Sequence, residues 1–318
     1  MPESVSSSDN IAISFTGHDT FPLRQGWLEK AYQLVDKKEE KPFLSDDAIV
    51  KLGVGKNMVN AIKHWALATN FIEKSSTGLI TSDYAKHLVE GGVDPFLENI
   101  GTIWKIHYEL CKKTSNTTAY WIFSHLNNPT FNRDELEQRL REFAIKSNNS
   151  ESGLKSIKTD INVVLAMYCR ARDKKMGQGK KVAQEDYISS PLADLNLVRR
   201  IGDNLYTLNT GLKKTLPQGL FISSIVDFWE GRDYKENRES QDGKTSLSIK
   251  VDDLLYDPLS PGRIFVLSEN ELKNRLHDIE NQTDGALILG GDAAGIPQVF
   301  KTSRKYKFNK LLAKWSEK

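Results

Sequence analysis

The 318-residue sequence has few metal-binding or disulfide-forming side chains and no long apolar run. It contains two cysteines, Cys111 and Cys169, and six scattered histidines. Without a Cys-x-x-Cys pair no zinc site can be predicted, and both cysteines are expected to be buried free thiols. No stretch approaches the roughly 20 apolar residues of a membrane helix, and residues 1–10 are polar. We therefore expect a cytoplasmic protein without a membrane partner.

The chain also lacks a strong excess of charge of either sign. Its 44 Lys and Arg residues against 42 Asp and Glu residues give a net charge of +2, and 39% of the residues are hydrophobic. These values are ordinary for a globular protein of two or three domains. Because the net charge is too small to indicate a nucleic-acid partner, that interpretation depends on where the basic residues lie.

Familiar catalytic motifs are missing as well. The sequence has neither a Gly-x-x-x-x-Gly-Lys-Ser/Thr phosphate loop nor a Gly-x-Ser-x-Gly elbow. A restriction-type nuclease would place an acid before Asp/Glu-x-Lys, and the nearest candidate is Asp257 followed by Glu271-Leu272-Lys273. Glu271 has a simpler interpretation as part of a capping box with Ser268. The sequence thus indicates no cofactor and names no metal site, and a divalent metal is expected only if the protein cuts DNA.

The clearest pattern lies between Ser45 and Leu88. It predicts a short helix over 46–52 that ends at Gly53, and an amphipathic helix over 56–69. Strands over 71–73 and 79–81 follow, joined by a polar turn. This order is typical of a winged helix-turn-helix, which presents its second helix to the DNA major groove. The alternative is a protein-binding winged helix whose polar face is simply solvated.

Basic and amide side chains on this pattern are candidates for DNA contact. Asn can recognise adenine edges, whereas Lys meets phosphates or guanine. The candidates are Lys56, Asn57, Asn60, Lys63, His64 and Lys74. Two later basic segments add Arg170, Arg172, Lys174, Lys175, Lys180, Lys181, Arg304, Lys305 and Lys307. A solvated linker for the first segment, and a docked last helix for the second, are the alternatives.

Residues 16–28 have no helical or strand period and indicate a shaped loop between a short strand over 11–15 and a helix over 27–37. Within the loop, His18 and Asp19 are weak catalytic candidates for acid–base chemistry, and Arg24 is a natural phosphate ligand. The alternative is that these side chains bond the loop's own backbone and hold it against the 45–88 pattern. No third catalytic partner is placed near them, which favours this alternative.

The rest of the chain completes an α+β fold that is mostly helical. We predict domains at 1–93 (loop and winged helix), 94–175 (helical) and 176–318 (α+β with a basic tail). The helical domain begins at Asp94, and Asn132 with Glu135 starts a charged helix. In the last domain we expect helices over 220–229 and 248–255 separated by an excursion over 231–243, and a strand over 263–267. A helix after Ser268 and a hairpin over 286–300 then complete a fainter, second winged-helix-like pattern.

Several stretches spread over nearly the whole chain resemble one bacterial family. They are Phe15-Thr-Gly-His18-Asp-Thr-Phe-Pro-Leu-Arg24-x-Gly-Trp27-Leu, Leu52-Gly-Val-Gly-Lys56-Asn57-Met-Val with Trp65, Asp94-Pro-Phe-Leu-Glu with Trp104 and His107, Ser190-Pro-Leu-x-x-Leu, and Leu259-Ser-Pro-Gly-Arg-Ile-Phe-x-Leu. The family is a domain of unknown function similar to SspB, a component of DNA phosphorothioate modification and defence loci. The resemblance implies a protein that binds duplex DNA and nicks it, or otherwise acts on it, so that sulfur enters the backbone.

The same resemblance implies the partners. They are double-stranded DNA, a sulfur-transfer protein resembling phosphoadenosine phosphosulfate reductase, and an ATPase component. A homodimer is also considered. The alternative function is a non-catalytic DNA-binding adaptor or transcriptional regulator that recruits partner enzymes.

Overall fold

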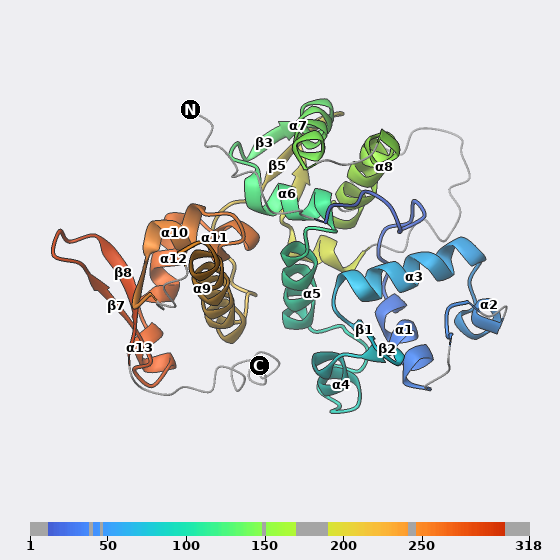
Figure 1. Cartoon of the computed structure of the whole chain (residues 1–318), viewed down its shortest axis with the longest axis horizontal. Coiled ribbons are helices and arrows are strands. Elements are labelled where there is room, and N and C mark those ends of the chain that lie inside the picture. The colour runs from blue at the N-terminus through green and yellow to red at the C-terminus, as the bar shows by residue number, and fades with distance from the viewer. Residues whose placement is uncertain are drawn as a thin grey trace.

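A computed structural model describes residues 12–37, 41–44, 47–147, 151–169, 190–240 and 246–302. In these ranges the chain has the predicted α+β class, with many helices and three small antiparallel sheets (Figure 1). No helix in the described ranges is both long and apolar enough to span a membrane. Of the two free cysteines, Cys111 is buried as predicted and Cys169 is partly exposed.

The N-terminal unit has the predicted order of helix, turn, helix and hairpin. Gly53 takes a φ of 64°, a left-handed turn that glycine adopts without steric cost. The hairpin strands pair antiparallel, and Ser82 caps the next helix by accepting a hydrogen bond from the Ala85 amide. Residues 12–15 form no strand, so the strand predicted over 11–15 is wrong for this part. The elements are α1 (Trp27–Asp36), α2 (Asp47–Leu52), α3 (Lys56–Ala68), β1 (Ile72–Ser75), β2 (Gly78–Thr81) and α4 (Asp83–Val89).

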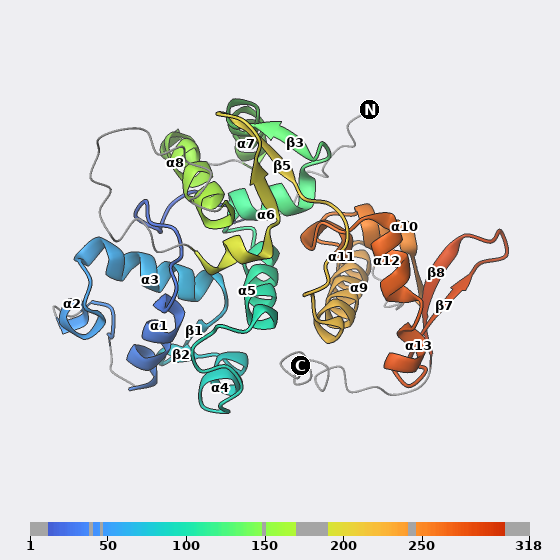
Figure 2. The same cartoon turned by 180° about the vertical axis from the view of Figure 1, so that it is seen from behind.

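Helix α5 (Ile100–Lys112) lies at the centre of the molecule, between the N-terminal and C-terminal parts (Figures 1 and 2). It begins at residue 100, not at Asp94 as predicted, because Asn99 caps it. The Asp94 carboxylate instead accepts hydrogen bonds from the amides of Glu98 and Asn99 and closes a turn before the helix. The helix therefore begins later than predicted, and Phe96, in the turn before it, is 63% exposed.

The middle unit combines helices with a three-stranded sheet of order β3-β5-β4. Strand β3 lies in the predicted helical domain over 94–175. Its partner β5 lies in the predicted α+β domain over 176–318. Asn132 caps α7 by accepting from the Glu135 amide, as the capping box predicts. The elements are α6 (Thr117–His125), β3 (Thr130–Asn132), α7 (Arg133–Lys146), α8 (Glu151–Tyr168), a 3-10 helix η3 (Pro191–Leu195), β4 (Val198–Arg200) and β5 (Leu205–Leu208).

The C-terminal unit repeats the topology of the middle unit. In both, a helix precedes a strand, further helices follow, and a closing hairpin pairs its last strand with the first one, giving the order β6-β8-β7 here. The predicted hairpin and the Ser268 cap on the Glu271 amide are present. The elements are α9 (Gln218–Ser240), β6 (Ser248–Lys250), α10 (Val251–Tyr256), α11 (Pro261–Ile264), α12 (Glu269–Leu276), α13 (Ile279–Gln282), β7 (Leu287–Gly291) and β8 (Pro297–Lys301).

Three local predictions in this unit are wrong. Helix α9 continues through the predicted excursion as far as Ser240, and residues 248–250 form strand β6 before the helix begins. The strand predicted over 263–267 is helix α11 and a turn, because Ser260 caps a helix there with Pro261 in its first turn.

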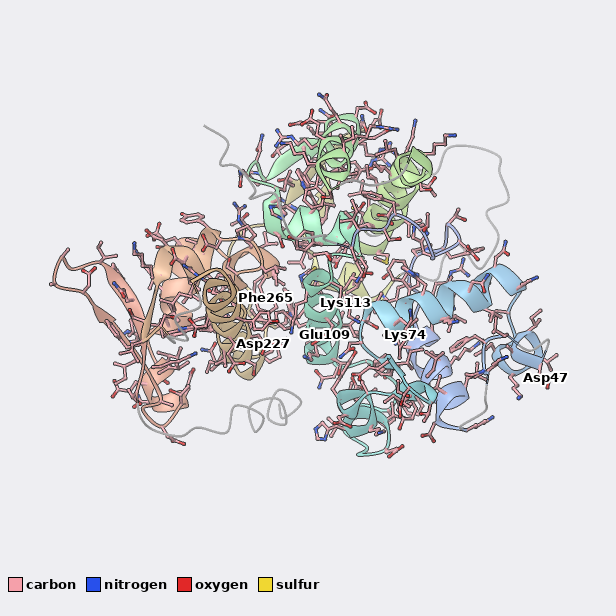
Figure 3. All side chains as sticks on the ribbon, viewed as in Figure 1. Asp47, Lys74, Glu109, Lys113, Asp227 and Phe265 are labelled. Atoms are coloured by element: carbon pink, nitrogen blue, oxygen red, sulfur yellow. The ribbon has the colours of Figure 1, made fainter. Side chains whose placement is uncertain are left out.

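Side chains from three elements meet on α5. His107 Nε2 lies 2.8 Å from the carbonyl oxygen of Ile264, and Nδ1 lies 2.7 Å from the Tyr168 hydroxyl. A carbonyl can only accept, so Nε2 carries the proton and the tyrosine donates to Nδ1. His107 is therefore a buried histidine of the core, and both of its ring nitrogens have hydrogen-bond partners. Asp227 and Phe265 of the C-terminal unit face the same helix (Figure 3).

Candidate nucleic-acid interface

The loop over residues 16–24 packs directly on helix α3 through His18. His18 Nδ1 accepts a hydrogen bond from the Thr20 amide at 3.1 Å, so its Nε2 carries the proton and donates to Asp160 Oδ1 at 2.9 Å. The ring also stacks on Trp65 with a centroid distance of 6.0 Å. His18 thus joins the loop to both α3 and α8, and its side chain is almost fully buried.

His64, on the same face of α3, is covered by this loop. A Cβ at Gly17 would lie 2.5 Å from His64 Nδ1, which shows how closely the loop backbone approaches the ring. Burial, assisted by the neighbouring His18, lowers the pKa of His64 to about 4. The His64 side chain is therefore neutral near pH 7 and does not add a positive charge to the surface.

Asn60 is the third residue of this face that the loop engages. Its amide nitrogen donates to Asp19 Oδ2 at 2.9 Å, and Asp19 takes a φ of 45°. Together with the contacts of His18, this bond matches the structural alternative, in which the loop's polar side chains hold it against the unit. A DNA contact by Asn60 would compete with its bond to Asp19.

Beyond the residues that the loop engages, α3 presents its first turn and Lys63. Lys56 and Asn57 are exposed and Lys63 is partly exposed, whereas Val59, Ile62 and Trp65 are buried. Lys74 is exposed on the β1–β2 hairpin. These residues form what we call the α3 basic face: Lys56, Asn57, Lys63 and Lys74. Within the described chain none of its lysines has an ion pair, so their charges are available to a ligand.

Arg24 lies at the base of α1, between two aromatic rings. Its guanidinium carbon is 5.7 Å from the centroid of the Phe21 ring and 5.5 Å from that of the Trp27 ring. Such cation–π contacts hold the planar group in place without neutralising its charge. Arg24 therefore presents a positioned, positively charged group close to the first turn of α3.

The remaining predicted DNA contacts lie outside the described residues. They are Arg170, Arg172, Lys174, Lys175, Lys180 and Lys181 of the first basic segment, and Arg304, Lys305 and Lys307 of the tail. Their participation stays a prediction.

The three charged residues of the nuclease-like pattern, Asp257, Glu271 and Lys273, each have a different partner. Glu271 accepts from Arg275 Nε at 2.7 Å, Lys273 pairs with Glu269, and Asp257 pairs with Arg232 at 3.1 Å. Each of these three charged groups is thus paired with a different neighbouring residue. Across the described ranges no group of three or more His, Cys, Asp or Glu side chains is arranged to hold a metal ion.

Comparison with known proteins follows this geometry. The model of a family described as "Protein of unknown function (DUF4007)" matches residues 15–315. The chain belongs to the DUF4007 family. Two solved structures resemble this DUF4007 protein, one described as magnesium ion-bound SspB and one as SspB. Each is 26% identical and covers 95% of this chain, with TM-scores of 0.77 and 0.75 and 87% and 86% of the SspB chains covered. No curated protein matches the chain.

Asp160 is the site residue that sequence reasoning missed. It lies on α8, 142 residues from its partner His18. On its own helix it lies on the buried face with Ile157 and Ile161, where a carboxylate indicates a polar partner without identifying it. Only the folding of α8 against the loop of the DUF4007 chain reveals it.

Proposed function

We propose that this DUF4007 protein is a DNA-binding component of a DNA phosphorothioate modification and defence system, with the N-terminal unit acting as a winged helix. Its fold-wide similarity to SspB supports the system. The observation that carries the DNA-binding proposal is the α3 basic face, whose lysines have no acidic partner in the described chain. Exposed, unneutralised lysines on the second helix and hairpin are what phosphate contact requires.

The covering loop limits how α3 can enter the groove. Because Asn60 is bonded to Asp19 and the His64 ring packs against Gly17, base contact falls to the first turn, where Asn57 is exposed and has no such partner. Helix-turn-helix proteins commonly contact base edges with the first residues of the recognition helix. Lys56 and Lys63 then meet phosphates on either side, and Lys74 of the hairpin reaches the backbone.

The decisive experiment measures duplex binding by the variant Lys56→Ala, Asn57→Ala and Lys63→Ala. At roughly 1–3 kcal/mol for a good contact, we expect affinity to fall by more than tenfold, and the salt dependence to lose about two counterion equivalents. The core residues of α3 are untouched, so circular dichroism should not change.

A matched control removes the same groups from the C-terminal unit. The variant Lys250→Ala, Lys273→Ala and Asn274→Ala also deletes two exposed lysines and one exposed asparagine. Gel-shift affinity should stay near that of the unmodified protein. Equal affinities of both triple variants would contradict the assignment of the α3 basic face.

A second candidate function, a non-catalytic adaptor, is favoured by the surface of the C-terminal unit. Its helix α12 begins with acidic residues, and the tip of its hairpin contains Asp292 and no basic residue. Leu289 and Ile296 on that hairpin are 37% and 40% exposed. Such a surface suits a protein partner better than DNA. The sulfur-transfer and ATPase components of the system are the proposed partners, and a homodimer is a further proposal.

A further inference from the structure

A cavity of about 610 Å³ opens between α1, α2 and the start of α3. Its volume falls in the range of roughly 300–1,000 Å³ that is typical of small-ligand sites. Its cationic lining consists of Arg24 and Lys30, and among the described residues no acidic side chain lines it. An open pocket whose described charged side chains are both cations attracts an anion.

Arg24 is the group best suited to bind that anion. Its guanidinium faces the Phe21 and Trp27 rings and has no ion pair or hydrogen bond within the described chain. Rings that contact the planar face leave the N–H edge available, and that edge matches phosphate oxygens bidentately. Little side-chain entropy is then lost on binding, because the aromatic contacts already restrict the group.

Much of the remaining lining of the cavity is apolar, with Gln25 as a further polar side chain. Ile49, Val54 and Met58 line it beside Trp27. A bare inorganic anion gains nothing from such walls, whereas a sugar and base attached to a phosphate would bury apolar surface against them. The ligand chemistry is therefore a phosphate joined to an organic group of nucleotide size.

We propose that this cavity binds one nucleotide unit of DNA, with its phosphate on the Arg24 guanidinium and its sugar and base against Ile49, Val54 and Met58. The proposal rests on the DNA-binding function for the source of the nucleotide, a chain end or a unit displaced from the duplex. The cavity lies beside the first turn of α3, so one bound DNA molecule can reach both the groove-facing side chains and the cavity.

Equilibrium dialysis with thymidine 5′-monophosphate, thymidine and inorganic phosphate tests the proposal on the full chain. We expect saturable binding of the monophosphate, and binding of thymidine and of phosphate that is at least about tenfold weaker. Inorganic phosphate binding as tightly as the monophosphate would overturn the nucleotide assignment, and so would equal binding of thymidine.

Two variants test the cavity itself. Arg24→Lys keeps the charge but loses the paired N–H donors of the guanidinium. It should weaken monophosphate binding about tenfold. Gly55→Leu places a side chain in the cavity: a Cβ there meets no atom within 4 Å, and the residue has an ordinary φ of −69°. It should abolish binding without unfolding the chain. Unchanged binding in both variants overturns the proposal, and the exposed-pair variant Arg139→Gln on α7 is the control.

The same variants separate this inference from the proposed function. The triple variant of Lys56, Asn57 and Lys63 should lose duplex binding and still bind the monophosphate. If the unmodified protein binds duplex in gel shifts but not the monophosphate, the cavity assignment fails while the DNA-binding proposal stands. If it binds the monophosphate but no duplex, the DNA-binding proposal fails and the cavity assignment stands.

Discussion

Burial gives His107 a measurable effect on stability. Its complete enclosure in the core lowers its pKa from 6.5 to about 4, against the smaller opposing effect of its hydrogen bond to Ile264. The unfolded chain therefore takes up a proton between about pH 6.5 and 4 that the folded chain refuses. The free energy of unfolding is highest above pH 6.5 and falls as the pH drops towards 4.

We expect this histidine to remove about 2 kcal/mol of stability between pH 7 and pH 5. His107→Gln does not titrate, and its amide can still donate to the Ile264 carbonyl and accept from Tyr168. Urea unfolding at both pH values should show a smaller loss for this variant than for the unmodified protein. His87→Gln at an exposed position is the control and should keep the full loss. A pH dependence that is the same in both variants would contradict the neutral core histidine.

The N-terminal loop contains three residues whose roles could not be assigned from the sequence alone. The sequence marked His18, Asp19 and Arg24 as unusual and offered both a catalytic and a structural interpretation. The structure supplies the partners: Asp160 for His18 and Asn60 for Asp19. Arg24 differs from both, because its charge has no acidic partner in the described ranges. Only contacts across the fold could separate these three roles.

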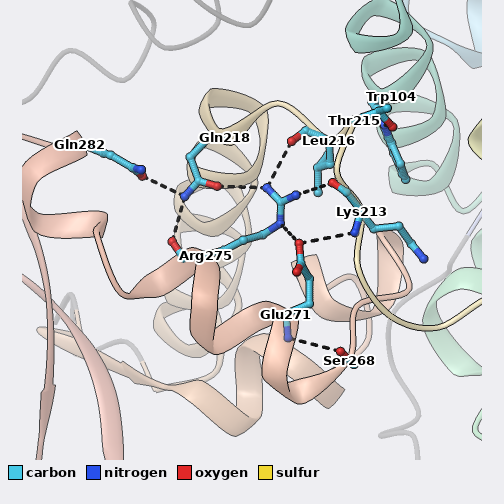
Figure 4. A network of polar contacts seen from close by, with 9 residues as sticks. All are labelled: Trp104, Lys213, Thr215, Leu216, Gln218, Ser268, Glu271, Arg275 and Gln282. Carbon is cyan, nitrogen blue, oxygen red and sulfur yellow. Dashed lines mark hydrogen bonds and ion pairs between the residues drawn. The ribbon is translucent and has the colours of Figure 1, made fainter.

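Among the elements, α12 contains a buried ion pair whose arginine also binds the segment before α9 (Figure 4). Glu271 accepts from Arg275 Nε at 2.7 Å, and both side chains are at most 10% exposed. Arg275 also donates to the carbonyl oxygens of Lys213 and Leu216, at 2.6 Å and 3.2 Å. The Arg275 guanidinium thus fastens the connecting segment to the C-terminal unit.

Removing the carboxylate charge should leave Arg275 buried without a counter-ion. We expect Glu271→Gln to lower the free energy of unfolding by about 3 kcal/mol. Glu269→Gln, in an exposed pair with Lys273 on the same helix, should cost less than about 1 kcal/mol. Urea titrations of both variants provide the comparison. Similar small losses would show that the buried pair does not stabilise this junction.

Elements with strong local signals were predicted well. The capping boxes at Asn132 and Ser268 mark real helix starts, because each depends on residues only three apart. The prediction of a strand over 263–267 was wrong. It rested on β-rich local composition, which a tertiary contact overrides. A Cβ on Gly262 would lie 2.6 Å from the Leu255 backbone, so α10 packs closely against the start of α11 at this glycine. Close packing of this kind overrides weak local propensity.

At the scale of the whole molecule, a prediction concerns DNA cleavage. The matching structure of SspB with a magnesium ion motivates the test. If the protein nicks DNA, as its family resemblance implies, the purified protein with Mg²⁺ should convert supercoiled plasmid to the open-circular form. The triple variant of the α3 basic face should do so more slowly, and chelation should stop the reaction. If no open-circular product forms with any divalent metal, nicking is contradicted and the adaptor function is favoured.

The sequence by itself determined the local order of the chain. The apolar period of α3, the glycine turn at Gly53 and the polar hairpin follow from neighbouring residues, and so do the candidate contacts Lys56 and Asn57. Its family resemblance also agrees with the DUF4007 match.

The tertiary structure decided which of those groups remain available. Strand β3 pairs with β5 from a segment more than 70 residues later, and His18 meets Asp160 across 142 residues. Contacts of the loop engage His64 and Asn60 but leave the first turn of α3 exposed beside Arg24. Neither fact has a local signal, because both depend on how buried surfaces fit together after the chain has closed.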